Sequence, residues 1–189
     1  MTNSNDVMKN DTLGRKPISV ELLVKVAVMA AITFVSAYVL HVPYINGNVL
    51  HLGDGMVFIG AVILGPVWGA VSAAIGMSLF DVISGYAVWA PFTFVIKAVM
   101  ALVAGLFAAG LRAEVVKRSA WVKALIGMIL GALLMVAGYY VAEGLLYGNW
   151  KTPVLMIPGN LAQSGFGVIV GMVILMALWR TAFKRYFLK

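Results

Sequence analysis

The segment HLGDGMVFIGAVILGPVWGA, residues 51–70, limits how the rest of the chain can fold. Its apolar part, residues 55–64, would form a helix of about 15 Å, whereas the hydrocarbon core of a bilayer is about 30 Å thick. A backbone group left unsatisfied in lipid costs several kcal/mol. We therefore expect this short helix to be partly inserted or steeply packed and buried against its neighbours, with Gly65 and Pro66 making a tight turn into the next helix.

Outside this segment the chain consists of longer apolar runs, which lie at residues 20–40, 67–83, 92–111, 122–142 and 154–183. Hydrophobic residues make up 62% of the 189 residues and charged ones only 11%, which is more apolar surface than a soluble core of this size can bury. The solvent around most of the chain must be lipid. We predict an all-α integral membrane protein with six transmembrane helices, a single membrane domain at residues 20–189 behind a cytoplasmic polar tail at residues 1–19.

The basic residues predict the orientation in the membrane, because short loops rich in Lys and Arg stay in the cytoplasm. With the N-terminus inside, six spans place twelve of the fourteen basic residues in inner segments: Lys9, Arg15, Lys16, Lys25, Arg112, Lys117, Arg118, Lys123, Arg180, Lys184, Arg185 and Lys189. Both termini are therefore expected in the cytoplasm, and the net charge of +7 reflects orientation rather than a nucleic-acid partner. A five-span alternative would put the middle basic cluster outside.

Polar side chains at membrane depth are expensive and mark candidate functional residues. Six of them fall in the outer half of the predicted helices: Asp54, Asp81, Lys97, Glu143, Asn160 and Gln163. Their common depth predicts a polar pocket open to the exterior. Some of these residues also have structural interpretations, since Asp54 suits the N-cap of its helix and Asp81 and Lys97 are placed to neutralise one another.

Asn160 and Gln163 are the strongest candidates for ligand contact. They are three residues apart on a predicted helix and so share a face. Each amide offers both donors and acceptors, which suits the edge of a pyrimidine or pyridine ring. The alternative is an ordinary hydrogen bond between helices.

Aromatic residues lie at the same level as the polar ones: Tyr44, Tyr86, Trp89, Phe92, Tyr139, Tyr140, Tyr147 and Trp150. They form either an interfacial aromatic belt or a set of rings that stack on a flat heterocycle. Tyr86 and Trp89 are the better placed for stacking. Tyr139 and Tyr140 are adjacent and face different directions, so only one of them is expected to line a cavity.

Residues 41–53 form a polar, bendable segment long enough to fold over the pocket as a lid. Within it, Asn48 and His51 are candidate ligand contacts. His51 is ten residues from His41 and has no clustered third ligand, so we expect no metal site, and no cofactor is implied.

Several motifs of catalysis are missing from the sequence. It has no GxxxxGK[ST] loop for ATP, no GxSxG, no HExxH and no cysteine, so the chain is not expected to be an enzyme. Small residues four apart, Ala27 and Ala31 among them, let helix backbones approach closely, either within the chain or against a partner membrane protein.

These residues resemble a family, the substrate-binding S components of energy-coupling factor (ECF) vitamin transporters. The resemblance rests on Ala27 and Ala31, on residues 51–70, on DVISGYAVWAPFTFVIKAVMALVAG at residues 81–105, and on IPGNLAQ at residues 157–163. It implies a six-helix subunit of a prokaryotic plasma membrane that works with a transmembrane coupling protein and two ATP-binding subunits. The resemblance further implies that Ala27 and Ala31 contact the coupling protein, that residues 41–53 act as a gate, and that Asn160 and Gln163 contact the ligand.

Within this family the chain looks most like the hydroxymethylpyrimidine-type members, neighbours of the riboflavin S components. Riboflavin-type members often carry a basic residue where this chain has Gln163, which leans toward a ligand smaller than a flavin. Pyridoxine fits the same chemistry, with Glu143 as the candidate partner of a protonated ring nitrogen. A stand-alone channel or proton-coupled carrier using Asp54, Asp81, Lys97 and Glu143 is the competing class, although these groups stop in the outer half of the membrane.

Overall fold

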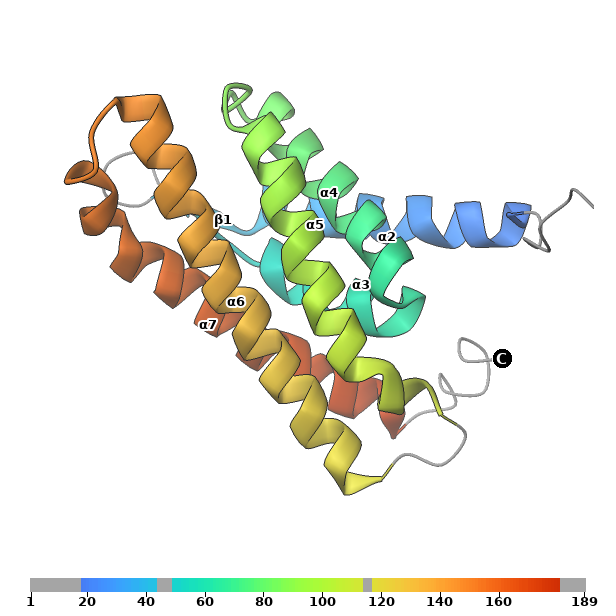
Figure 1. The fold of residues 1–189 in the computed structure, drawn as a ribbon. Helices are drawn as coiled ribbons and strands as arrows, with labels where there is room; N and C mark the ends of the chain where they lie inside the picture. The colour runs from blue at the N-terminus through green and yellow to red at the C-terminus, as the bar shows by residue number, and fades with distance from the viewer. Residues whose placement is uncertain (1–17, 44–48, 114–116, 181–189) are drawn as a thin grey trace, which may run out of the picture.

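The computed structural model describes residues 18–43, 49–113 and 117–180. The elements follow one another as α2 (Val20–Val39), β1 (His41–Pro43), β2 (Val49–His51), α3 (Gly53–Leu64), α4 (Pro66–Ile83), α5 (Ala90–Phe107), the 3-10 helix η2 (Ala108–Arg112), α6 (Arg118–Tyr147) and α7 (Thr152–Trp179). Helices α3 to α7 form one bundle, and α2 lies across it and extends beyond it to one side (Figure 1). The predicted all-α class is confirmed, and the two short strands pair antiparallel, with His41 opposite His51.

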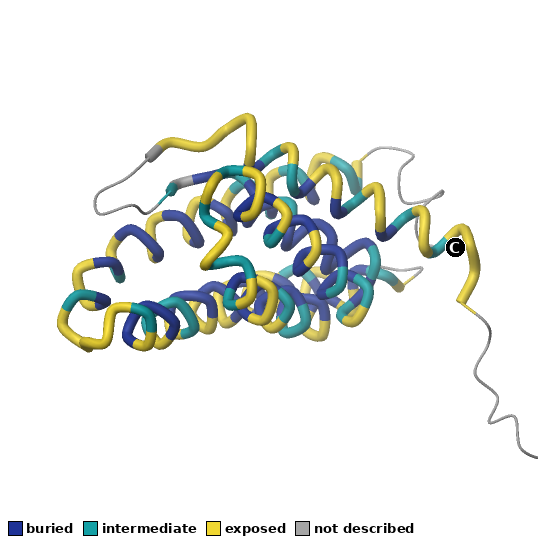
Figure 2. Tube along the Cα trace, turned by 90° about the horizontal axis from the view of Figure 1, so that it is seen from above, coloured by how far each residue is buried: buried dark blue, intermediate teal, exposed yellow. Residues whose placement is uncertain are grey.

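Five of the described helical segments are long and apolar enough to cross a membrane: Val20–Val39, Pro66–Ile83, Ala90–Arg112, Arg118–Tyr147 and Thr152–Trp179. Many of their large hydrophobic side chains are turned outward, and Figure 2 shows buried and exposed positions alternating along the helices. An outward apolar surface of this extent is stable only in lipid.

The sixth helix, α3, is the short apolar one. It has twelve residues, and ten of them are buried, in contact with α2, α4, α5 and α7. The prediction that this helix is buried against its neighbours is therefore confirmed. Glycines allow the close fit: a Cβ on Gly69 of α4 would lie 2.5 Å from Cα of Ala61, and one on Gly105 of α5 would lie 3.0 Å from the backbone oxygen of Ala61.

Both ends of α3 have specific partners. Gly65 follows the helix with φ 85°, a conformation that suits glycine, and Pro66 opens α4 directly behind it. The carbonyls of the last turn accept from Arg112 at the end of η2, whose Nη1 lies 3.4 Å from Ala61 O and 3.2 Å from Val62 O. The same guanidinium also donates to Gly105 O of α5 at 3.4 Å. Arg112 thus satisfies carbonyls that a half-length helix would otherwise leave bare.

Helix α2 is less enclosed than the others. One stripe of it is buried, formed by Val26, Ala30, Thr33 and Ala37. Ala27 and Ala31 are exposed and line a shallow apolar groove between α2 and α4. By contrast, Gly167 and Gly171, two small residues four apart on α7, pack inside the chain, with Gly167 against Asp54 of α3.

We expect Arg112→Met to destabilise the protein by about 1–3 kcal/mol, because carbonyls of α3 and α5 lose their donor in an apolar environment. Arg112→Lys should recover only part of the loss, since an ammonium lacks the planar fork of the guanidinium. Thermal unfolding in detergent measures the effect, with Arg118→Met at an exposed position as the matched control. Equal unfolding midpoints for the two Met variants would contradict the assigned role.

Candidate functional site

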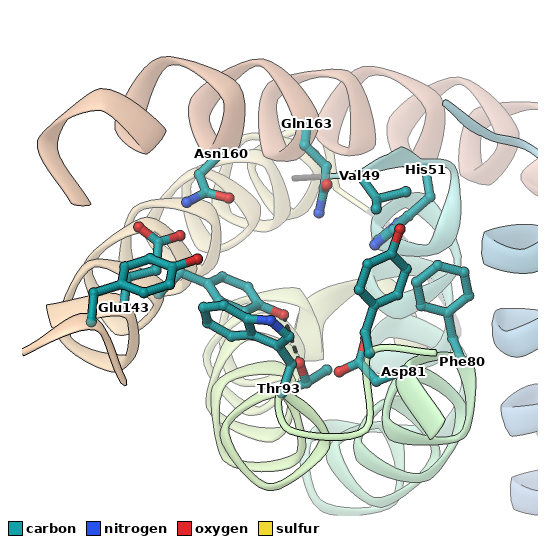
Figure 3. A pocket seen from close by; sticks show the side chains of 12 residues that line it. Val49, His51, Phe80, Asp81, Thr93, Glu143, Asn160 and Gln163 are labelled. Carbon is teal, nitrogen blue, oxygen red and sulfur yellow. Dashed lines mark hydrogen bonds between the residues drawn. The ribbon is translucent and has the colours of Figure 1, made fainter. Parts of the chain in front are cut away.

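A pocket lies where the β1–β2 pair, α4, the turn after it, α5, α6 and α7 come together. Its volume is about 60 Å³. The polar side chains around it are His51, Asp81, Thr93, Glu143, Asn160 and Gln163, and the others are Val49, Phe80, Tyr86, Trp89, Tyr139 and Tyr147. In Figure 3, Asn160 and Gln163 of α7 face Thr93 and Asp81 across the opening, while Glu143 and His51 lie at its two ends. Residues from distant parts of the chain therefore lie around one cavity.

The floor of the pocket is a buried ion pair. Nζ of Lys97 donates to Oδ1 of Asp54 at 2.5 Å, and both side chains have zero exposure. The other carboxylate oxygen, Oδ2, accepts from Nε2 of Gln163 at 3.0 Å. Lys97 also lies 5.4 Å from the ring centroid of Tyr139. One charged cluster thus joins α3, α5 and α7 directly beneath the pocket.

This cluster corrects two predictions. Lys97 pairs with Asp54 and not with Asp81, because α3 starts at the level of the pocket and brings its first turn against α5. The N-cap role proposed for Asp54 is also wrong: the N-cap residue of α3 is Leu52, and the Asp54 carboxylate bonds to side chains of other helices. The bond from Gln163 is the interhelical hydrogen bond that the sequence left as an alternative, although the same residue still lines the pocket.

Aromatic rings form much of the wall. Tyr139 Oη shares a hydrogen bond of 3.0 Å with Oγ1 of Thr93, which fixes the tyrosine ring. The Trp89 ring lies 6.5 Å from that of Tyr139 and 6.1 Å from that of Tyr147, centroid to centroid. Tyr140, the neighbour of Tyr139, points elsewhere and donates to Trp150 O at 3.4 Å. Of the two adjacent tyrosines, Tyr139 lines the pocket and Tyr140 does not.

Three buried polar atoms at the pocket have no hydrogen-bond partner among the described residues: Nδ1 of His51, Oδ2 of Asp81 and Oε2 of Glu143. Such groups are rare in folded proteins because each costs about 1–3 kcal/mol when left unpaired. Burial lowers the pKa of His51 to about 4, so the imidazole is neutral near pH 7. The pocket therefore presents two carboxyl groups and a neutral imidazole to whatever it binds.

The eleven predicted ligand contacts divide into three groups. Lining the pocket are His51, Asp81, Tyr86, Trp89, Tyr139, Glu143, Asn160 and Gln163. Asp54 and Lys97 lie underneath and act on the pocket through Gln163 and Tyr139. Asn48 lies outside the described residues, as does the middle of the predicted lid, residues 44–48.

Sequence reasoning missed Thr93 and Phe80 as lining residues. Thr93 lies four residues before Lys97 on α5, so the shared helix face was a usable signal. Phe80 stacks edge-on against His51 at 5.2 Å, and nothing in the sequence distinguishes it from a lipid-facing ring. Flat aromatic walls with polar atoms at the edge suit the binding of a small heterocycle. The described residues hold no group of three or more His, Cys, Asp or Glu that would bind a metal ion.

Comparisons with known proteins agree with this description. Residues 17–180 match the family described as ECF-type riboflavin transporter, S component. The thiamine precursor transporter HmpT of Lactococcus lactis subsp. cremoris is 25% identical over 173 residues, which cover 90% of this chain and 95% of that protein. An uncharacterized protein of Pyrococcus woesei is 34% identical over 122 residues, 65% of this chain and 76% of the other.

The resemblance found in the sequence is thereby confirmed. The family is a substrate-binding part of a transporter and not an enzyme, and it implies partnership with a transmembrane coupling component and ATP-binding components. Together with the apolar helices, it makes this a multi-pass protein of a prokaryotic plasma membrane. The chain belongs to the S-component family of ECF-type vitamin transporters.

Proposed function

We propose that this S component captures hydroxymethylpyrimidine, the pyrimidine precursor of thiamine, at the outer face of the membrane. The observation that carries the proposal is the pair of unpartnered carboxyl oxygens on Asp81 and Glu143, facing one small cavity with aromatic walls. An aminopyrimidine is flat, donates hydrogen bonds through its amino and hydroxymethyl groups, and gains a positive charge when its ring nitrogen is protonated. Carboxyl groups in a pocket of low dielectric favour such a ligand.

The remaining pocket residues have complementary roles in this proposal. Trp89 and Tyr139 stack on the ring, with Tyr86 and Tyr147 at its border. The amides of Asn160 and Gln163 contact the ring edge. The unpaired Nδ1 of His51 forms a hydrogen bond with the ligand, as donor or acceptor according to the tautomer of the imidazole. The strand β2, which carries His51, belongs to the segment proposed to close over the pocket.

Size separates the candidate ligands. A volume of about 60 Å³ holds on the order of five water molecules, which is the scale of one six-membered ring and its substituents. A tricyclic flavin with its sugar-alcohol chain is much larger, and riboflavin is therefore the less favoured ligand. Pyridoxine is the second candidate, because it is also a single hydroxymethylated ring with donors for the same unpaired carboxyl oxygens.

A proton-coupled carrier or channel is disfavoured by the distribution of charge. Asp54 and Lys97 are bonded to one another and fully buried, so they do not form a relay with the other carboxyl groups. Below them the interior consists of apolar side chains, among them Phe58, Met100 and Met128, all with zero exposure. Energy for uptake is instead proposed to come from ATP-binding partner subunits.

The orientation proposed is six crossings with both termini in the cytoplasm. Helices α5 and α7 end, and α6 begins, at one end of the bundle, while the turns after α4 and α6 lie at the other (Figure 1). The first end carries Arg112, Lys117, Arg118, Lys123 and Arg180. The positive-inside rule places that end in the cytoplasm and the pocket toward the exterior. The exposed Ala27 and Ala31 are proposed to contact the transmembrane coupling protein, because small side chains allow close helix approach.

Equilibrium binding to the purified protein tests the ligand. Hydroxymethylpyrimidine is expected to bind more tightly than pyridoxine, thiamine or riboflavin, and Asn160→Ala or Glu143→Gln should each weaken binding by about 1–3 kcal/mol. Tyr140→Phe is the matched control, since Tyr140 points away from the pocket. Tight binding of riboflavin with none of hydroxymethylpyrimidine would refute the proposed ligand.

Replacing Ala27 or Ala31 with Phe should abolish uptake in cells that contain the coupling and ATP-binding subunits, while the purified variant keeps its ligand affinity. A bulky ring there would hold the two membrane proteins apart. Val28→Phe, at a neighbouring exposed position of α2, should leave both measurements unchanged. Loss of binding in the alanine variants would show that these residues act within the subunit.

The absence of cysteine makes orientation easy to measure with single introduced thiols. In intact cells Lys151→Cys should react with a membrane-impermeant maleimide, whereas Lys117→Cys should react only after permeabilisation. Both positions are exposed, so access depends on the side of the membrane alone. The five-span arrangement requires the reverse pattern.

A further inference from the structure

The carboxylate of Asp54 determines which way the amide of Gln163 points. An ionised carboxylate only accepts hydrogen bonds, so the contact of 3.0 Å to Oδ2 must come from the NH₂ group of Gln163. The carbonyl oxygen of that amide has no hydrogen bond among the described residues, although Gln163 lines the pocket. Asp54 thus takes one of the two N–H donors of the amide and holds the NH₂ group on its own side, while the carbonyl acceptor stays wholly free for a ligand.

Lys97 maintains this arrangement. Its Nζ lies 2.5 Å from the other carboxylate oxygen, and with both side chains at zero exposure no water competes for either charge. A buried ion pair seldom increases the stability of a protein, since replacing both charged residues with apolar ones is often neutral or stabilising. Its presence against a pocket-lining amide therefore calls for a role in the site.

We infer that the Asp54–Lys97 pair is a specificity device that fixes Gln163 as a hydrogen-bond acceptor, so that the pocket selects a ring carrying an amino group over the same ring carrying an oxo group. Asp54 and Lys97 are positioning residues, because they act on the ligand through Gln163. This inference rests on the proposed function, namely that the pocket binds a pyrimidine.

The variant Asp54→Asn reverses the geometry with little change of shape. The carbonyl oxygen of the introduced amide can keep the bond from Lys97, and its NH₂ group then replaces the acceptor that faced Gln163. Gln163 must rotate to offer its carbonyl to that NH₂ group, which turns its own NH₂ group toward the ligand. An oxo group on the ring would accept from that donor, whereas an amino group would not.

The experiment measures dissociation constants of the purified protein for 4-amino-5-hydroxymethyl-2-methylpyrimidine and for its 4-oxo analogue. The native protein should prefer the amino compound, and Asp54→Asn should move the ratio of the two constants toward the oxo compound by at least tenfold. In a Gln163→Leu background the same substitution should leave the ratio unchanged, because the amide that transmits the effect is gone. A merely structural role for Asp54 would weaken both ligands alike.

A second variant covers the case in which the unpaired Lys97 of Asp54→Asn prevents folding. Asp54→Asn combined with Lys97→Met removes both charges. The ratio of the two dissociation constants should still shift away from the amino compound. A folded variant that keeps the native ratio would overturn the inference while leaving the proposed function standing. Failure of the native protein to bind either pyrimidine would instead overturn the proposed function, and this inference with it.

Discussion

The ion pair between Asp54 and Lys97 fixes where the first turn of the short helix α3 meets α5. Helix α3 is only twelve residues long, and each of its ends contacts a cation: Lys97 through Asp54 in the first turn, and Arg112 directly at the last carbonyls. Both contacts match the helix dipole, which favours an acidic group at the start and a basic group at the end. Lys97 belongs to α5, and Arg112 belongs to η2, which follows α5 directly in the chain. Both ends of the short helix therefore contact one continuous segment.

The pocket lies directly above this ion pair. Helix α3 begins only at Gly53, and none of its residues lines the pocket, which is formed by β2, α4, α5, α6, α7 and the turn after α4. The strand β2 places His51 against Phe80. The floor is then the ion pair, the walls are aromatic, and the unpartnered oxygens of Asp81 and Glu143 lie at the edge.

Much of this is predictable from the sequence, and the limits are physical. Apolar runs and basic loops predict helix order and depth, and common depth is enough to group Asp81, Glu143, Asn160 and Gln163 in one place. The depth of a residue does not tell which way its side chain points around the helix axis, however. For that reason the sequence suggests a pair between Lys97 and Asp81, whereas Asp54 is the residue that faces Lys97. The sequence predicts only that Arg112 lies on the cytoplasmic side. Its hydrogen bonds to the last carbonyls of α3 could not be predicted, because they depend on where that short helix ends in three dimensions.

The same constraint bears on how a ligand would cross the membrane. Beneath the ion pair lie fully buried apolar side chains, such as Phe58 of α3 and Met100 of α5. Gly131 of α6 packs closely here, because a Cβ on it would lie 2.7 Å from the backbone oxygen of Met100. Opening a path through these side chains would expose Asp54 and Lys97 singly, and separating a buried ion pair is strongly unfavourable. In the proposed function, movement of the loaded subunit as a whole against a partner avoids that cost, because the floor stays intact while the pocket changes sides. In the proposed function, the exposed Ala27 and Ala31 of α2 are the residues that contact that partner.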